Sequence, residues 1–298
     1  MKYDILSFMI FIKQLLNRLG MLDVIRVLIS YSPLRLLRSV LGKTIHNRFY
    51  KSCQRLYLGN RNKLNQFDED GVFFIDQALH LDESEVKVIQ SEFLNIDSII
   101  SFDYETGTYK TGEDIGEYNY LNRKCIDRMN LASQFIKLPI LKKLEMHMGS
   151  NLCLHHFTVT RVKPGAFIDK GSFIYHRDSQ PNNRFKIIVY LTDSLNDESG
   201  PFEYLLGSHK TYNGLPQFGD SRYKDISREN VKTFYGKSGD GIVFLNNGIH
   251  RGGRTTINDR IVLTGLYTPS KINMESHFEK YGYLSTGDEE WSLKANGY

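Results

Sequence analysis

The stretch Tyr175-His176-Arg177-Asp178 decides how this chain is interpreted. In an extended strand, residues two apart project to the same face, so His176 and Asp178 can both point inward while Arg177 points away. A second histidine, His250, follows more than seventy residues later. Two imidazoles and one carboxylate on one face of an iron ion leave its other face open for co-substrate and dioxygen. The ordered set therefore predicts a mononuclear Fe(II) site.

Three segments near these residues have the composition of buried strands. Residues 185–191, 242–245 and 260–267 are rich in β-branched and aromatic side chains, which is typical of such strands. We expect their ends to bring the candidate residues to one mouth of a double-sheet barrel that encloses a ligand-sized cavity. The predicted fold is mainly β with flanking helices, a double-stranded β-helix (jelly roll or cupin-like barrel) plus a helical N-terminal appendage.

One arginine is suited to a separate role at this mouth. A guanidinium group is always charged and presents a planar fork that matches a carboxylate, so Arg260 fits the distal carboxylate of a dicarboxylic co-substrate. A lone His-x-Asp pair occurs by chance in most long chains, whereas the ordered set in a strand context is a stronger indication. The alternative is a group of hydrogen-bonded polar residues at strand ends, which we consider a weaker explanation of the order.

From about Asp70 to Pro269 the chain resembles the phytanoyl-CoA dioxygenase family of Fe(II)/2-oxoglutarate-dependent oxygenases. The stretches that carry the resemblance follow one another in the family's order. They are the opening strand 70–76, the turn 163–165, the pair His176–Asp178, the run 191–210, which ends in Gly-Ser-His-Lys, and the segment 239–250. Two positions depart from the family pattern: Leu206 replaces the usual proline, and residues 251–254 are more basic than the common His-Gly-Gly or His-Gly-Ser sequence.

This resemblance implies Fe(II) as the cofactor and 2-oxoglutarate and O2 as co-substrates, with release of succinate and CO2. It implies that His176, Asp178 and His250 bind the metal and that Arg260 holds the far carboxylate of 2-oxoglutarate. Halogenating relatives lack the carboxylate, so Asp178 favours hydroxylation over halogenation. Which hydroxyl assists Arg260 stays open, and the candidates are Thr255, Thr256 and Thr264.

The substrate is not indicated by these residues. Specificity lies in loops and not in the metal ligands, so a lipid, an acyl thioester, a lipid-linked sugar and a small metabolite all stay open. Two other functions compete with the oxygenase. One is a cupin-like module that binds metal without 2-oxoglutarate, and the long gap between Asp178 and His250 and the presence of Arg260 argue against it. The other is a non-catalytic scaffold that binds a membrane or a protein through residues 1–66, and the complete triad argues against it.

Residues 1–66 differ from the rest of the chain in charge. They hold twelve Lys or Arg against Asp4 and Asp23, which gives +10, so the remainder carries −6 of the total +4. Their apolar runs are interrupted by charges too often for a membrane-spanning helix, which needs roughly twenty apolar residues. We expect residues 1–66 to form a basic amphipathic helical appendage, and residues 67–298 to form the oxygenase domain with its barrel core at about 150–270.

Two roles for the appendage stay open. Basic amphipathic helices lie in anionic membrane interfaces, and the alternative is packing on the barrel or on a second subunit. Nucleic acid is not expected as a partner, because the interleaved residues are aliphatic and not stacking aromatics. The odd, widely spaced cysteines Cys53, Cys125 and Cys153 and the lack of an evident secretory signal favour a cytoplasmic protein, with peripheral membrane contact as a variant.

Several other elements are expected around the barrel. Helices are predicted over residues 82–94, 120–136 and 139–148, and long loops over 103–112 and 213–230.

Histidines outside the triad are expected to be structural. One of His155 and His156 must face inward, where a hydrogen-bonded histidine is a better explanation than a third imidazole ligand. His209 is interpreted as support near the mouth, and His46 and His147 lack partners at ligand spacing.

Overall fold

The computed structural model describes residues 33–103, 108–114, 118–165, 171–178, 184–211 and 226–286. The chain divides into two compact units, residues 1–47 and 48–298. The helices predicted before residue 33 and most of the loop predicted over 213–230 lie outside the described residues. The second unit contains the candidate site, and the boundary predicted at residue 66 stays a prediction.

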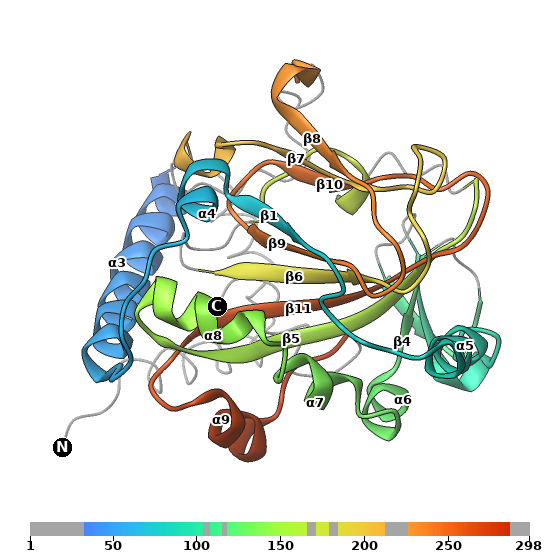
Figure 1. Cartoon of the computed structure of the whole chain (residues 1–298), viewed down its shortest axis with the longest axis horizontal. Coiled ribbons are helices and arrows are strands. Elements are labelled where there is room, and N and C mark those ends of the chain that lie inside the picture. The colour runs from blue at the N-terminus through green and yellow to red at the C-terminus, as the bar shows by residue number, and fades with distance from the viewer. Residues whose placement is uncertain are drawn as a thin grey trace. The chain divides into compact units, whose positions relative to one another are not determined.

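Two antiparallel sheets form the second unit (Figure 1). The larger sheet has eight strands in the order β1-β9-β6-β11-β5-β4-β2-β3, and the smaller has three in the order β10-β7-β8. Neighbouring strands are mostly far apart in sequence, as the crossovers of a jelly roll require. The strands are β1 (Val72–Ile75), β2 (Ile99–Asp103), β3 (Thr108–Thr111), β4 (Tyr118–Leu121), β5 (Asn151–Val162), β6 (Phe185–Tyr190), β7 (Phe202–Leu205), β8 (Val231–Phe234), β9 (Gly241–Leu245), β10 (His250–Gly252) and β11 (Arg260–Ser270). The predicted fold class is confirmed.

Helices flank the sheets, as predicted. The described α-helices are α3 (Pro33–Leu56), α4 (Asn65–Asp70), α5 (Glu83–Glu92), α6 (Arg123–Arg128), α7 (Leu131–Phe135), α8 (Ile140–Met148) and α9 (Met274–Tyr281). The predictions over 82–94 and 139–148 are confirmed by α5 and α8. Helix α5 begins where the sequence indicates, because Asp82 and Glu85 form a reciprocal capping box.

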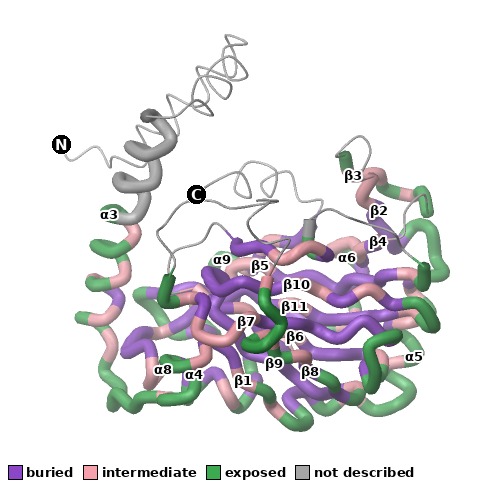
Figure 2. Tube along the Cα trace, turned by 90° about the horizontal axis from the view of Figure 1, so that it is seen from above, coloured by how far each residue is buried: buried purple, intermediate pink, exposed green. Residues whose placement is uncertain are grey.

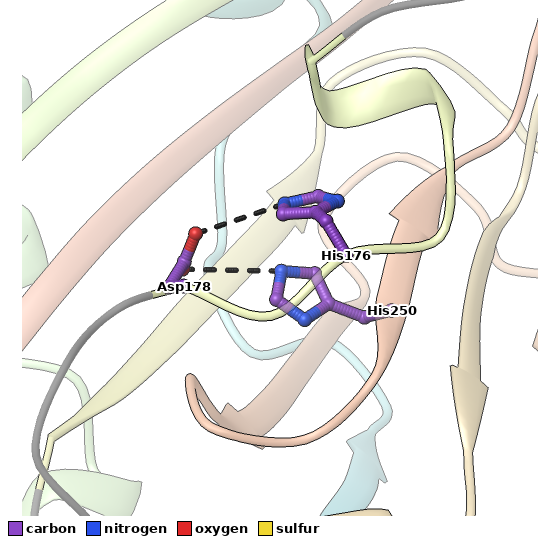
Figure 3. Close-up of side chains that lie close together, drawn as sticks. All are labelled: His176, Asp178 and His250. Carbon is purple, nitrogen blue, oxygen red and sulfur yellow. Dashed lines mark ion pairs between the residues drawn. The ribbon is translucent and has the colours of Figure 1, made fainter. Parts of the chain in front are cut away.

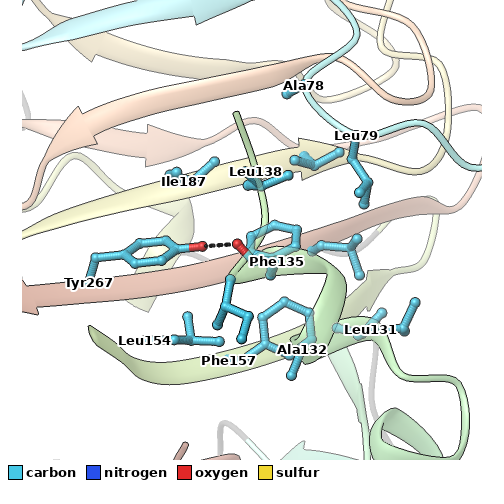
Figure 4. Close-up of a cluster of buried hydrophobic side chains, with 14 of the residues drawn as sticks. Ala78, Leu79, Leu131, Ala132, Phe135, Leu138, Leu154, Phe157, Ile187 and Tyr267 are labelled. Carbon is cyan, nitrogen blue, oxygen red and sulfur yellow. Dashed lines mark hydrogen bonds between the residues drawn. The ribbon is translucent and has the colours of Figure 1, made fainter. Parts of the chain in front are cut away.

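The long strands β5 and β11 are neighbours in the middle of the larger sheet, and alternate residues of β11 point to its two faces. Their register runs from Arg260 opposite Val162 to Ser270 opposite Asn151, with one irregularity after Leu266. Alternate residues of β11, including Leu263 and Tyr267, join the main apolar core beneath α7 and α8. In Figure 4, Tyr267 reaches across this core, where its hydroxyl donates a hydrogen bond to the Phe135 carbonyl at 2.9 Å. The other side of β11 faces the smaller sheet.

A second apolar cluster lies between the two sheets. It contains Tyr190, Val262 and Phe244 of the larger sheet and Phe202 and Tyr204 of the smaller one. We call the sides of the two sheets that face this cluster the inner face. Most residues of β9 and β11 are buried, as Figure 2 shows, so chemistry on the inner face takes place in surroundings with little water.

The helix predicted over residues 120–136 is wrong in part, because it begins only at Arg123 and is divided into α6 and α7. Tyr118–Leu121 forms β4, which pairs with both β2 and β5. The side chain of Asn122 then caps α6 by accepting a hydrogen bond from the Cys125 N–H at 3.0 Å. Asn130 adopts a left-handed conformation with φ of 52° and separates α6 from α7. Pairing with distant strands thus overrides a locally helical pattern.

The loop predicted over residues 103–112 is also wrong in part. Its two ends belong to β2 and β3, which pair from Ile100 opposite Thr111 to Asp103 opposite Thr108. Tyr109 of β3 packs against Phe102 of β2, with ring centroids 4.8 Å apart. The segment is therefore a hairpin at the edge of the larger sheet.

Candidate active site

The His176 and His250 segments are joined directly by backbone hydrogen bonds. Each residue donates its N–H to the other's carbonyl at 3.0 Å, which makes an isolated antiparallel bridge. His250 begins β10, where it pairs with Tyr204 of β7. The two imidazole centroids are 4.4 Å apart. Two residues separated by more than seventy positions are thus held side by side.

The hydrogen bonds of the two rings fix which nitrogen can bind a metal. Nδ1 of His176 lies 2.8 Å from the Ile174 carbonyl, and Nδ1 of His250 lies 2.9 Å from the Gly248 carbonyl. A carbonyl only accepts, so each Nδ1 carries the proton and each Nε2 presents a lone pair. This is the usual arrangement of a metal-binding histidine, in which the far nitrogen donates to a backbone or carboxylate oxygen.

Asp178 completes the group (Figure 3). Its Oδ1 lies 3.7 Å from Nε2 of His176, and its Oδ2 lies 3.9 Å from Nε2 of His250. One ligand atom from each of the three residues can be chosen so that all lie within 4.8 Å of one another, and all three residues are buried. The Asp178 N–H donates to the Asn246 carbonyl at 3.0 Å, which ties it to the end of β9. Two neutral imidazoles and a carboxylate at this spacing fit a single divalent cation.

The charge states suit metal binding. Burial and the nearby His176 ring lower the pKa of His250 to about 3, and burial also lowers the pKa of His176. Burial alone would raise the pKa of Asp178, but the Lys186 ammonium and the two histidines lower it below its usual range. At neutral pH the site therefore offers two lone pairs and a full negative charge.

Lys186 is a site residue that the sequence interpretation missed. Its Nζ lies 2.6 Å from Oδ2 of Asp178, and its side chain is about one quarter exposed, at 25%. It occupies β6, opposite Phe244 of β9 and Leu266 of β11. A signal was available, because a lysine within a strand predicted to be buried on both sides needs a charged partner.

Arg260 lies on the other side of His250 from Lys186. A Cβ atom added to Gly252 would lie 2.9 Å from its Nη2, and Gly252 shares a strand face with His250. Since Gly252 lies two residues after His250 on β10, the guanidinium lies beside the strand that carries this histidine. Its Nη1 donates to the Gly200 carbonyl at 2.9 Å, and the side chain is buried. The glycine thus leaves room for the arginine beside the candidate metal ligands.

The three threonines considered as partners of Arg260 have other partners or positions. Thr255 donates its hydroxyl to the Asn258 carbonyl, Thr256 donates to the Glu198 carbonyl at 3.4 Å, and Thr264 lies four residues away along β11. Two tyrosines instead influence its charge: burial lowers the pKa of Arg260, and Tyr190 and Tyr118 oppose that shift.

The two tyrosines lie in different parts of the structure. The Tyr190 hydroxyl donates to the Phe234 carbonyl at 2.8 Å and accepts from the Phe202 N–H at 2.9 Å. Tyr118 is half-buried and lies in register with Val162, which itself pairs with Arg260. The sequence interpretation did not single out Tyr118.

Two polar groups behind the site hold the histidine segments in place. Arg177 points away from the triad, as predicted, and donates to the Ser208 and Asn247 carbonyls at 2.8 and 2.6 Å. The Ser208 hydroxyl accepts from the Ile249 N–H at 2.7 Å. This serine belongs to the Gly-Ser-His turn, and His209 Nε2 lies 3.1 Å from the Asp68 carbonyl.

Arg251 explains part of the basic departure at residues 251–254. Its Nη2 lies 2.6 Å from Oε1 of Glu203, and its guanidinium lies 4.4 Å from the Tyr175 ring centroid. Tyr175 also donates its hydroxyl to Glu203. Because Tyr175 precedes His176 and Arg251 follows His250, this group links the two ligand-bearing segments on the side away from the inner face.

His156 is the member of the histidine pair that faces inward. It lies opposite Leu266 on β11, in the row of Lys186. Burial, Lys186 and His155 lower its pKa to about 3, so it is neutral at neutral pH. His147 accepts a hydrogen bond from the Leu64 N–H at 3.1 Å and lies outside the His176, Asp178 and His250 group.

The family of the chain follows from a comparison with family models. The model described as phytanoyl-CoA dioxygenase matches residues 36–262. The chain belongs to this family, as the motifs at His176, Asp178 and His250 indicate. It is accordingly an Fe(II)- and 2-oxoglutarate-dependent dioxygenase, a class that uses iron with 2-oxoglutarate and O2. No curated protein matches the chain.

Three solved structures show a similar chain path. The nogalamycin-biosynthesis epimerase SnoN, a non-heme α-ketoglutarate-dependent enzyme, is 19% identical over 74% of this chain and 84% of its own, with a TM-score of 0.48. HygX from Streptomyces hygroscopicus, with nickel, 2-oxoglutarate and hygromycin B bound, is 18% identical over 72% and 89%, with a TM-score of 0.48. EctD from S. alaskensis, with 2-oxoglutarate and 5-hydroxyectoine, is 20% identical over 69% and 74%, with a TM-score of 0.48.

Proposed function

We propose that this dioxygenase hydroxylates an unactivated C–H bond of a lipid, a lipid-linked sugar or a small metabolite. In this proposal His176, Asp178 and His250 hold Fe(II), and Arg260 holds the distal carboxylate of 2-oxoglutarate. The observation that carries it is the convergence of the three buried ligand groups, each with its ligand atom within 4.8 Å of the others. The presence of Asp178 supports hydroxylation over halogenation, which needs that position for a halide.

The donor set fits iron in three respects. Both imidazoles are fixed in the tautomer that presents Nε2, the carboxylate is ionised, and no cysteine belongs to the group. When bound, Fe(II) supplies the activation of dioxygen that is coupled to the decarboxylation of 2-oxoglutarate to succinate and CO2.

The residues of the chain contribute position and electrostatics. The reciprocal hydrogen bonds between His176 and His250 set the spacing of the imidazoles. Arg260, held against Gly200 and Gly252, presents a fixed positive fork that fits a carboxylate. Phe202 and Phe244, with ring centroids 5.8 and 4.8 Å from that of His250, keep water from this side of the site. Charged groups in largely dry surroundings strengthen the attraction for a dianionic co-substrate.

Turnover of 2-oxoglutarate tests this function directly. Purified protein with Fe(II), ascorbate and a panel of lipids, lipid-linked sugars and small metabolites should release succinate with the correct substrate. The product should gain the mass of one oxygen atom. The variant Asp178→Ala should release none, whereas Asp197→Ala, which loses only the exposed Tyr235 hydrogen bond, should match wild type. Succinate release that is equal in both variants would contradict the assignment.

We also propose that the protein is cytoplasmic and makes a peripheral contact with an anionic membrane, which would bring the enzyme close to a lipid-derived substrate. No described helix is long and apolar enough to cross a bilayer. From Arg48 on, α3 belongs to the second unit, and one side of this part carries Tyr50 and Gln54, which donate hydrogen bonds to the Met148 carbonyl at 2.9 and 3.0 Å. Its other side and the following turn expose Phe49, Leu56 and Leu58 at 42, 52 and 98%.

Charge next to these apolar residues favours a lipid surface over a second protein. From Pro33 to Gln66 the chain contains eight basic residues and no acid, and each Lys or Arg near an anionic bilayer contributes about 1 kcal/mol. The full-length protein should co-sediment with anionic vesicles and dissociate as salt increases. Phe49→Ser combined with Leu58→Ser should weaken binding, whereas Val88→Ser, which changes an exposed residue of α5, should not. Equal binding by both proteins would contradict the proposal.

A further inference from the structure

Lys186 is a charged residue in a position where charge is costly. It lies within β6 between the buried residues Phe185 and Ile187, and its partners across the two neighbouring strands, Phe244 and Leu266, are apolar. An ammonium group at such a place needs a counter-charge. Asp178 supplies it, with Nζ 2.6 Å from Oδ2. The ion pair therefore involves one of the proposed metal ligands.

This contact makes the two oxygens of Asp178 unequal. Each oxygen lies near one imidazole, with Oδ1 3.7 Å from Nε2 of His176 and Oδ2 3.9 Å from Nε2 of His250, but only Oδ2 also lies 2.6 Å from the ammonium nitrogen. The main chain of Asp178 is fixed by its hydrogen bond to the Asn246 carbonyl, and Lys186 is fixed within a strand paired on both sides. One oxygen of the carboxylate thus already lies against a positive charge, and the other does not.

We propose that Lys186 is a positioning residue that reserves Oδ2 of Asp178, so that the carboxylate can bind the metal only through Oδ1. This inference rests on the proposed function. A triad that donates three atoms leaves three positions of a six-coordinate ion for a chelating co-substrate and dioxygen. A carboxylate that used both oxygens would occupy one of these positions. Lys186 thereby keeps a co-substrate position open.

The same ammonium group opposes the metal electrostatically. A positive charge next to a ligand oxygen repels a divalent cation, and the repulsion is stronger in a buried site than in water. Removing the charge should therefore strengthen metal binding while it weakens co-substrate binding. Changes of opposite sign distinguish positioning from a purely structural role, in which metal binding, co-substrate binding and stability would decline together.

Calorimetric titration without oxygen or turnover can measure both affinities, first with Mn(II) and then with 2-oxoglutarate on the Mn(II)-loaded protein. Lys186→Met keeps an unbranched side chain but removes the charge and the donor. Mn(II) should bind it at least as tightly as wild type, and 2-oxoglutarate should bind at least tenfold more weakly. Lys186→Gln keeps an uncharged donor that can still hold Oδ2. It should gain Mn(II) affinity and lose less than threefold in 2-oxoglutarate affinity.

Lys87→Met is the matched control, because Lys87 makes an exposed ion pair of similar length, 2.7 Å, with Glu83 on α5. Both of its affinities should equal those of wild type. Parallel loss of both affinities in Lys186→Met and Lys186→Gln, together with a lower melting temperature, would overturn the proposal, as would two unchanged affinities. If wild type binds neither Mn(II) nor 2-oxoglutarate, the proposed function fails and this inference fails with it. If wild type binds both Mn(II) and 2-oxoglutarate but the Lys186 variants do not change as predicted, only the inference about Lys186 fails and the proposed function stands.

Discussion

The two sides of strand β11 perform different tasks with alternating residues. Leu263 and Tyr267 are fully buried in the apolar core beneath the helices. Arg260 and Thr264 face the smaller sheet, in the same row of positions as the site. Core residues contribute stability through the area that they bury, whereas the buried charges of the inner face are costly and serve binding. Substitutions on the two sides should therefore separate folding from chemistry.

The largest expected effect is the loss of turnover on the inner face. Replacing His176, Asp178 or His250 by Ala should abolish iron-dependent turnover, because each removes one of three ligand atoms. The proteins should stay folded, since these side chains contribute little to the apolar core. Iron content and circular dichroism measure the two properties separately. An Asp178→Ala protein that retains iron as wild type does would refute the assignment of the inner face.

On the other face of β11, which packs in the main apolar core, a substitution should reduce stability and leave metal binding unchanged. Leu263→Ala should lower the free energy of unfolding by about 2–5 kcal/mol, as deletion of a fully buried leucine side chain generally does. Urea denaturation measures this loss. The Mn(II) affinity of the folded protein should not change, because Leu263 faces away from the ligands. A selective loss of metal affinity without loss of stability would show that the two sides are not separable.

Arg260→Lys tests the inner face at its other end. Lysine keeps the charge but loses the planar fork, so the apparent KM for 2-oxoglutarate should rise at least tenfold, or about 1.4 kcal/mol of binding. Arg251→Lys and Arg254→Lys should have smaller effects. Steady-state kinetics with varied 2-oxoglutarate provide the measurement. A larger effect at Arg254 would place the co-substrate elsewhere.

The smallest effect concerns pH and His156. Burial lowers the folded-state pKa of His156 to about 3, whereas an unfolded histidine has a pKa of about 6.5. As the pH falls below that value the unfolded state binds the proton first, so stability present at neutral pH is lost progressively. Between pH 7 and 5.5, protonation of His156 in the unfolded state should lower the free energy of unfolding by roughly 1 kcal/mol. His156→Asn should lose correspondingly less stability than wild type in denaturation curves at the two pH values, and identical losses would exclude the effect.

Local patterns in the sequence were sufficient for much of the fold. The β-branched runs at 185–191, 242–245 and 260–267 correspond to β6, β9 and β11, and the acidic start at Asp82 corresponds to the cap of α5. The structure also brings His176, Asp178 and His250 together, which the His-x-Asp spacing and the strand order predicted. These features depend on alternation and capping, which neighbouring residues determine.

Features that depend on distant partners were not predictable in the same way. Tyr118–Leu121 is a strand because β2 and β5 flank it, and its sequence does not specify those partners. Lys186 became a site residue only when β6 was placed beside Asp178. Likewise, Tyr118 lies near Arg260 through the register of three strands, whereas the threonines were considered for their closeness in sequence.

The central claim is that the inner face binds Fe(II) and 2-oxoglutarate together through His176, Asp178, His250 and Arg260. An anaerobic titration of the Fe(II)-loaded protein with 2-oxoglutarate tests it directly, because chelation of Fe(II) by the 2-oxo acid produces a charge-transfer absorption in the visible range. Wild type should develop this absorption and saturate at one 2-oxoglutarate per chain. Arg260→Lys should need a higher concentration, and Asp178→Ala should show no absorption. An iron-loaded wild-type protein without the absorption, or an Asp178→Ala protein with the wild-type titration curve, would contradict the account.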